Sequence, residues 1–273
     1  MRIYSNMHTH TSFCDGKESA ETMVKAAIEK GFKSLGFSGH SYTPFDDDYC
    51  MSLEGTRRYR ETVADLQKKY EGEIEILCGI EWDYYANINT QEWDYTIGSV
   101  HYVKSPRNGR YYDVDYTYDK LDLCIREGFA GDVGAMIKAY YDNVIDMACN
   151  CRPTVLGHFD LIRKLNMGNR FFNENSPKYL SIASNAIEQA VKAGAIVEVN
   201  TGGMFRGYCD TPYPDDWILK SLKKLGGSVI VSSDAHVRQS IDYAFDDIED
   251  KLRKLGFKEV KELRKSGFIS TKL

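Results

Sequence analysis

Residues 228–236 read Ser-Val-Ile-Val-Ser-Ser-Asp-Ala-His, an apolar, β-branched run that ends in an aspartate and a histidine. The amino terminus repeats this arrangement, because the run Arg2–Met7 is followed by His8, Thr9 and His10. Alternate side chains of an extended chain share one face, so both members of each pair point the same way. Each pair can therefore chelate one metal ion or bracket two adjacent ions.

Short apolar runs of this kind alternate with helical patterns along the chain. The predicted strands are Arg2–Met7, Lys33–Ser38, Ile74–Ile80, Tyr95–Val100, Thr154–Gly157, Ala195–Val199 and Ser228–Ser232. The predicted helices are Ser19–Lys30, Gly55–Tyr70, Ser176–Lys192, Pro214–Leu225 and Ile241–Leu255. The alternation predicts an α/β protein with a parallel sheet, and no repeat or linker divides residues 1–273 into more than one domain.

Two architectures fit this order of elements, an open doubly wound sheet and a closed α/β barrel. A barrel gathers functional residues at the carboxyl ends of many strands, whereas an open sheet uses the few ends at its switch point. All six histidines lie at or just past the ends of predicted strands, and Glu81 and Glu198 lie at two further ends. The arrangement therefore favours the barrel, with the site at the carboxyl ends of its strands.

Nine side chains near these strand ends are candidate metal ligands: His8, His10, Asp15, His40, Glu81, His101, His158, Asp234 and His236. Neutral imidazole is a common zinc ligand, and one catalytic ion uses about three protein ligands. Nine ligands predict three ions, particularly if Glu81 bridges two of them. Alone, a histidine such as His40 is usually a core or surface residue, and Asp15 lies in a turn-forming sequence. Their joint placement favours the metal site.

Composition narrows the class of protein. The net charge is −5 and the pI is about 5.7, so no global basic field attracts nucleic acid. No apolar stretch approaches the ~20 residues of a membrane span, and the residues before His8 leave no room for a signal peptide. The seven cysteines include no Cys-x-x-Cys pair, which indicates reduced thiols. We expect a cytoplasmic protein with no nucleic-acid or membrane partner, and the sequence leaves its oligomeric state open.

In its ligand pattern the chain resembles the polymerase and histidinol phosphatase (PHP) family. All nine candidate ligands match the family's motifs in order, and the likeness runs from Met7 to His236. It is strongest to the monofunctional histidinol-phosphatases of the family, over residues 7–16, 98–103 and 157–163. The resemblance implies a distorted (β/α)7 TIM-like barrel that holds three divalent ions, drawn from zinc, manganese and iron.

The resemblance also implies how the ligands are shared among the ions. The three sets are His8, His10, Glu81 and Asp234; Glu81, His101 and His158; and Asp15, His40 and His236. The implied activity is hydrolysis of L-histidinol phosphate to L-histidinol and phosphate in histidine biosynthesis. Hydroxide shared by the first two ions would attack phosphorus, so Glu81, Asp234 and His236 are expected at the reacting centre.

Arginine is expected to complete the phosphate site, because its planar guanidinium matches two phosphoryl oxygens. Arg163 and Arg206 follow the fifth and sixth predicted strands on the ligand side, and the resemblance supports this catalytic role. Either arginine could instead cap a helix or pair with a carboxylate. The ammonium and imidazole of the substrate require acidic and aromatic contacts, for which the candidates are Tyr42, Phe45, Asp46 and Asp160.

The segment from Tyr102 to about Asp119 is too long for an ordinary βα connection. It is either a lid or substrate contact, or a tyrosine-rich surface loop packed on its own helix.

The sequence leaves three alternatives to this activity. The same metal site could hydrolyse a nucleotide, a sugar phosphate or phosphotyrosine. An amidohydrolase-like enzyme is disfavoured because no lysine ends a predicted strand near mid-chain. A non-catalytic metal-bound module is disfavoured by the unbroken ligand set.

Overall fold

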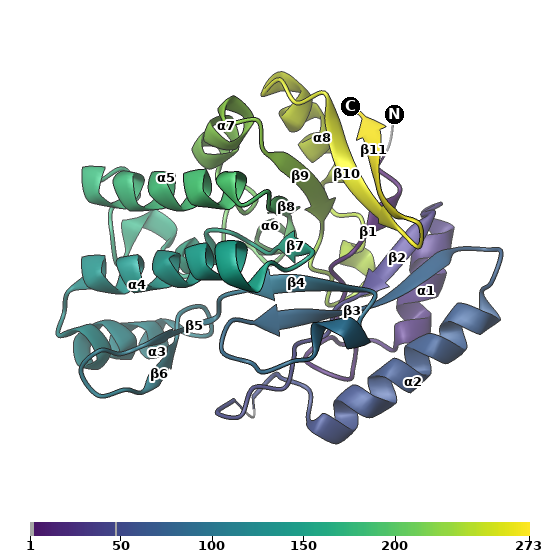
Figure 1. Ribbon diagram of the computed structural model, residues 1–273, viewed down its shortest axis with the longest axis horizontal. Helices are drawn as coiled ribbons and strands as arrows, with labels where there is room; N and C mark the ends of the chain where they lie inside the picture. Colours follow the sequence, from purple (N-terminus) through teal and green to yellow (C-terminus); the bar gives the residue numbers. More distant parts are fainter. Residues whose placement is uncertain (1–2, 47) are drawn as a thin grey trace.

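The computed structural model describes residues 3–46 and 48–273, and it contains the predicted parallel array (Figure 1). Its strands are β1 (Ser5–Asn6), β2 (Ser34–Phe37), β3 (Glu75–Asp83), β4 (Tyr95–Ser99), β7 (Val155–Leu156), β8 (Ile196–Asn200) and β9 (Ser228–Ser232). They pair in parallel in this order. All seven predicted strands are confirmed, except that Arg2, the start of the first prediction, lies outside the described residues.

Helices cover the outside of the sheet, with α4 and α5 on one side and α1 and α2 on the other (Figure 1). The helices are α1 (Ala20–Glu29), α2 (Leu53–Lys69), α3 (Tyr118–Leu123), α4 (Val133–Asp146), α5 (Pro177–Lys192), α6 (Gly202–Phe205), α7 (Asp216–Lys224) and α8 (Phe245–Lys254). Single π-helical turns, η2 (Cys124–Gly128) and η3 (Met147–Cys151), extend α3 and α4. The short 3-10 turns are η1 (Thr90–Glu92), η4 (Leu161–Arg163), η5 (Met167–Asn169) and η6 (Arg238–Ser240).

Serine side chains fix the starts of three predicted helices. Ser19, Ser52 and Ser176 each accept a backbone N–H from the first turn of α1, α2 and α5. The five predicted helices are therefore present, with bounds a few residues different from those predicted. No element was predicted for α3, α4 and α6; α3 and α4 lie within the connection between β4 and β7.

The sheet curls until its first and last parallel strands meet at their carboxyl ends. There Thr9 and Ala235 form a parallel bridge, in which the His10 N–H donates to Ala235 O at 2.8 Å and the Ala235 N–H donates to His8 O at 3.1 Å. These bonds close a distorted TIM-like barrel at the level of the predicted ligands. Barrel closure, favoured from the placement of the histidines, is thus confirmed.

At the amino end of the barrel the same gap is filled by a hairpin that was not predicted. It consists of β10 (Glu259–Arg264) and β11 (Gly267–Lys272), and β10 pairs with β9 through Lys261 and Ile230. The Ser34 hydroxyl donates to Leu263 O at 3.0 Å, which ties the hairpin to β2. The hairpin therefore completes the wall where β1 and β9 diverge.

The barrel interior changes from apolar to polar along each strand. Buried apolar side chains fill its amino-terminal half: Met7, Leu77, Tyr95, Ile97, Val155, Ile230 and Leu263. Closer to the carboxyl ends, the inward positions carry buried carboxylates. Glu81 lies four residues after Leu77 on β3, Glu198 lies two residues after Ile196 on β8, and Asp234 lies four residues after Ile230, just past the end of β9. Because alternate residues of a strand share a face, the same pattern that builds the core directs these carboxylates into one cluster above it.

Candidate metal centre

The carboxyl ends of the parallel strands bring all nine predicted ligands together. His8 and His10 follow β1, and Asp234 and His236 follow β9, so the barrel closure sets the two pairs side by side. The single ligands at the ends of β2, β3, β4 and β7 are His40, Glu81, His101 and His158. Convergence of residues 8 to 236 at one end of the barrel is what the strand-end pattern predicted.

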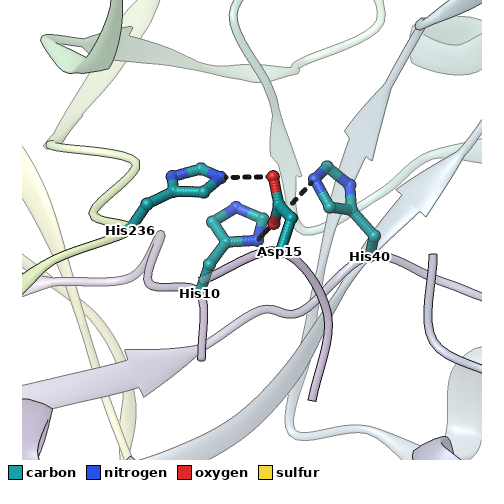
Figure 2. Close-up of side chains that lie close together, drawn as sticks. All are labelled: His10, Asp15, His40 and His236. Carbon is teal, nitrogen blue, oxygen red and sulfur yellow. Dashed lines mark hydrogen bonds and ion pairs between the residues drawn. The ribbon is translucent and has the colours of Figure 1, made fainter. Parts of the chain in front are cut away.

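Asp15 is the centre of one ligand group, with three imidazoles around it (Figure 2). Its Oδ2 is 3.0 Å from His236 Nε2, and its Oδ1 is 3.5 Å from His10 Nδ1 and 3.7 Å from His40 Nε2. One ligand atom from each residue lies within 4.8 Å of the others. The group contains the predicted set of Asp15, His40 and His236, and the structure adds His10 to it.

Glu81 joins the remaining ligands, as expected of a bridging carboxylate. Its Oε2 lies 2.9 Å from His40 Nδ1, 3.3 Å from His8 Nε2 and 3.5 Å from His10 Nε2. Its Oε1 lies 2.8 Å from His158 Nε2 and 3.3 Å from His101 Nε2. Two further ligand groups therefore share this residue: His8, His10 and Glu81, and His40, Glu81 and His101.

The donor atoms fit divalent metal ions. Within the described residues, His8 Nε2, His10 Nε2, Asp15 Oδ1 and Glu81 Oε2 are buried and, although other ligand atoms lie close to them, they make no hydrogen bond of acceptable geometry. Buried polar atoms are rarely left in this state, because each unsatisfied atom costs about 1–3 kcal/mol. Imidazole nitrogens and carboxylate oxygens together suit zinc, iron or manganese. A cluster of cations would satisfy all four atoms.

The charges of the cluster support the same conclusion. Burial raises the pKa of Glu81, but the imidazoles of His40, His8 and His101 outweigh it and hold that pKa well below its ordinary value. Burial, with the positive charges of His236 and His40, lowers the pKa of His10 to about 3. The Glu81 carboxylate is therefore ionised and the His10 imidazole neutral at neutral pH, as metal binding requires. Burial lowers the pKa of His8, His40 and His101, but the neighbouring carboxylates outweigh it and raise these pKa values, so a bound cation would take the place of the protons there.

Glu198, at the inward position of β8, holds two of the ligands in place. Its Oε1 accepts from His8 Nδ1 at 2.6 Å and from the Ser232 hydroxyl, and its Oε2 accepts the His158 N–H at 2.7 Å. A carboxylate partner fixes the tautomer of a ligating imidazole and raises its basicity. The sequence marked Glu198 as a strand-end residue, but no role was predicted for it. Its position, two residues after Ile196 on the inward face, is the signal that could have identified it.

A cavity of about 400 Å³ opens above the cluster. Besides seven of the predicted ligands, its wall carries cations, carboxylates and aromatic rings: Lys17, Lys164, Arg206, Asp48, Asp115, Tyr49, Tyr116 and Tyr208. The Tyr49 ring packs 4.7 Å from the His40 ring, centroid to centroid. Its hydroxyl oxygen is buried without a hydrogen-bond partner among the described residues. The cavity thus offers both charge and hydrogen-bonding groups to a polar ligand.

Arg206 lies where the sequence predicted, on the wall of this cavity. Its Nη2 donates to Asp234 Oδ2 at 2.9 Å, and its Nη1 lies 3.0 Å from His236 Nδ1. Gly202 makes this approach feasible, since a Cβ there would lie 2.8 Å from Arg206 Nη2. Guanidinium has five N–H donors, so Arg206 can orient Asp234 and still donate to a phosphate.

Arg163 and Asp160 are not placed in the cavity, in contrast to the prediction. Arg163 donates to Asp160 at 3.0 Å, to Glu174 at 2.7 Å and to Asp215 at 2.9 Å, and it lines a separate cavity of about 350 Å³. Asp160 is fully buried in this network and accepts the Asp215 N–H. Three carboxylates surround the Arg163 guanidinium, so it serves the structural role that was its alternative.

Tyr42 and Phe45 also lie off the cavity above the cluster. Tyr42 is an exposed side chain of the loop after β2. Phe45 stacks on Tyr111 with ring centroids 4.2 Å apart and faces a neighbouring cavity of about 460 Å³. Asp46 accepts a hydrogen bond from the Tyr102 hydroxyl. Loop side chains such as these are directed by local packing, which strand-end reasoning does not cover.

The segment after β4 forms a hairpin of β5 (Tyr102–Lys104) and β6 (Tyr111–Asp113) before it reaches α3. Only its last part, Asp115 and Tyr116, lines the cavity among the described residues. Both alternatives therefore hold in part: the hairpin tip packs on its surroundings, and the turn that follows β6 contacts the site.

The fold and the ligand cluster define an α/β barrel with a candidate metal centre at the carboxyl ends of its strands, and comparison with known proteins identifies the family. Residues 6–202 match the PHP domain, and the chain belongs to this family. Histidinol-phosphatase of Bacillus subtilis is 26% identical over 265 residues, covering 88% of this chain and 96% of the relative.

Solved structures agree on the fold. A Listeria monocytogenes protein superimposes with a TM-score of 0.75 at 21% identity, covering 89% of this chain and 99% of that one. Histidinol phosphate phosphatase of Lactococcus lactis, solved with zinc, L-histidinol and phosphate, gives a TM-score of 0.66 at 18% identity, covering 97% and 98%. No helix in the described part of the chain has the length and apolar character needed to traverse a bilayer.

Proposed function

We propose that this chain is a phosphatase that hydrolyses L-histidinol phosphate to L-histidinol and inorganic phosphate. The observation that carries the proposal is the convergence of nine imidazole and carboxylate ligands beneath a cavity with cationic walls. The full-length similarity to the Bacillus subtilis histidinol-phosphatase supports the choice of ester. The seven free thiols support a cytoplasmic location.

The proposed cofactors are three divalent ions, held by the three ligand sets that Glu81 connects. When bound, such ions neutralise the charge of a phosphate dianion and supply a nucleophilic water at neutral pH. The protein keeps Glu81 and Asp234 deprotonated, Glu198 orients His8, and Asp234 is itself oriented by Arg206. The buried carboxylates, rather than solvent, thus set the positions of the cations.

The phosphate is bound on the cationic side of the cavity. Arg206 offers the N–H groups that are not occupied by Asp234 and His236, and Lys17 and Lys164 add positive charge. A phosphate ester in this position would have its phosphorus directly above the ligand cluster. Its alcohol portion would then face Tyr116 and Tyr208, which line the same cavity.

A substrate panel with the metal-reconstituted protein tests this proposal. L-Histidinol phosphate should exceed nucleotide, sugar-phosphate and phosphotyrosine esters in kcat/KM by more than tenfold. Metal analysis should find two to three ions per chain, and alanine at His101 or Asp234 should reduce turnover by orders of magnitude. A preference for another ester would reassign the substrate, and an inactive protein that still binds its metals would indicate a non-catalytic module.

A further inference from the structure

An ion pair on the cavity wall is not accounted for by metal binding. Lys164 Nζ lies 2.8 Å from Asp115 Oδ2, and both side chains line the cavity above the cluster. Asp115 is in the turn after β6, and Lys164 directly follows η4, so the pair connects two segments that are 49 residues apart. If either charge of such a pair loses its partner, the remaining charge must find another one of opposite sign.

The pair interacts electrostatically with both the metal ligands and Arg206. Burial raises the pKa of Asp115, but Lys164, His101 and His158 outweigh it and lower the pKa; both histidines line the same cavity as Asp115. Burial and Arg206 lower the pKa of Lys164, but Asp115 raises it by more. Lys164 and Arg206 both line the cavity above the cluster, so one phosphate in that cavity can be approached by both cations. Its paired carboxylate in the described structure is Asp115.

We propose that Asp115 and Lys164 select phosphate esters whose alcohol carries an ammonium group on the carbon next to the ester carbon. The substrate's ammonium replaces Lys164 at Asp115, and the released Lys164 ammonium turns to the phosphate beside Arg206. This inference rests on the proposed function, because L-histidinol phosphate has its ammonium at that position. No covalent bond changes in the exchange, and each buried charge keeps an opposite partner.

Charge balance explains the selectivity. An ester without an ammonium must either bind without the help of Lys164 or leave Asp115 buried and unpaired. Sites built around a substrate's N–H groups reject analogues that lack them by factors that reach 10⁴. For this partly accessible pair we expect a preference of about 100-fold for the ammonium ester.

The test compares L-histidinol phosphate with its deaminated analogue, 3-(imidazol-4-yl)propyl phosphate. Asp115→Asn should lower kcat/KM for the ammonium ester about 100-fold, while the deaminated ester keeps its rate or gains a few-fold as Lys164 becomes free. Loss of both rates by the same factor, or an unchanged preference, would overturn the proposal. Zinc content and melting temperature show whether each variant is folded and loaded.

Two further variants separate recognition from structure. Asp113→Asn makes the same change beside the same turn. Asparagine keeps the Oδ1 that accepts the Asp115 and Tyr116 N–H groups, and Asp113 lines the neighbouring cavity with Phe45 and Lys120, so the preference should persist. Lys164→Met should lower kcat/KM mainly for the ammonium ester, because only that ester releases the Lys164 ammonium to the phosphate. The contact between Asp115 and the substrate's ammonium remains, so part of the preference should persist. If Lys164→Met instead abolished the preference while Asp115→Asn preserved it, the assigned roles would be wrong.

The proposed function can fail separately. Wild-type protein that hydrolyses p-nitrophenyl phosphate but neither imidazole ester would refute the assigned substrate. Comparing O-phosphoethanolamine with ethyl phosphate then tests the ammonium site at Asp115, since only the first ester has the ammonium. An equal rate for these two esters would overturn the ammonium site.

Discussion

Replacing Glu198 with glutamine should weaken metal binding although Glu198 lies outside the three ligand groups. The Glu198 carboxylate is fully buried and accepts four donors. Its Oε1 accepts from His8 Nδ1 at 2.6 Å and from the Ser232 hydroxyl. Its Oε2 accepts the His158 N–H at 2.7 Å and Asn200 Nδ2 at 3.1 Å. Every one of these contacts depends on an oxygen that accepts hydrogen bonds.

Glutamine has the same shape but only one such oxygen. Its amide nitrogen would face two donors, and each buried donor left without an acceptor costs about 1–3 kcal/mol. The expected loss is therefore roughly 2–6 kcal/mol, divided between folding and metal affinity. Loss of a carboxylate behind a ligating imidazole typically weakens metal affinity 10- to 100-fold. We expect a loss of that size, with a matching fall in kcat/KM at limiting zinc.

Zinc affinity can be measured by competition with a chelating dye, and activity by phosphate release. Glu262→Gln is the matched control, because Glu262 is also a buried glutamate but pairs with Thr271 and Arg264 in the β10–β11 hairpin. Its zinc affinity should equal that of wild type. If Glu198→Gln bound zinc as tightly as wild type, Glu198 would have no part in positioning the cluster.

Three further outcomes are expected. Gly202→Ala should lower kcat/KM by about ten- to 100-fold in a phosphate-release assay, because a Cβ there would lie 2.8 Å from Arg206 Nη2 and 2.9 Å from Asp234 Cβ. An unchanged kcat/KM would show that the Arg206 side chain can move aside without loss of activity. Burial and Asp115 raise the pKa of Asp113 to about 7. The stability that protonated Asp113 contributes is therefore present at low pH and is lost as the pH rises from about 4, the pKa of an unfolded aspartate, to about 7. In urea unfolding, Asp113→Asn should therefore gain stability relative to wild type between pH 5 and 8, and a constant difference would contradict this. Removal of metal by a chelator should lower the melting temperature by about 10 °C, reversibly with zinc, and an unchanged temperature would refute a structural contribution from the ions.

The core architecture and the convergence of the candidate ligands could be read from local sequence patterns. The paired spacing of His8 with His10, and of Asp234 with His236, combines with apolar runs whose carboxyl ends meet in any parallel barrel. The β10–β11 hairpin could not be placed in this way, because its position depends on the gap between β1 and β9, which exists only in the folded barrel. For Glu198 the inward position can be read from the sequence, but its contacts with His8 and His158 depend on other strands and cannot.

Arg163 and Lys164 show where the limit lies. The sequence by itself determined that a cation follows His158 near the cluster, since chain length keeps this segment at the carboxyl end of β7. It could not decide which of the two adjacent side chains faces the cavity. In a 3-10 turn successive side chains differ by about 120°, so one residue separates a carboxylate-bound structural arginine from a lysine on the cavity wall. Only the packing of η4 against the barrel fixes that rotation, because the contacts that set it come from residues distant in the chain.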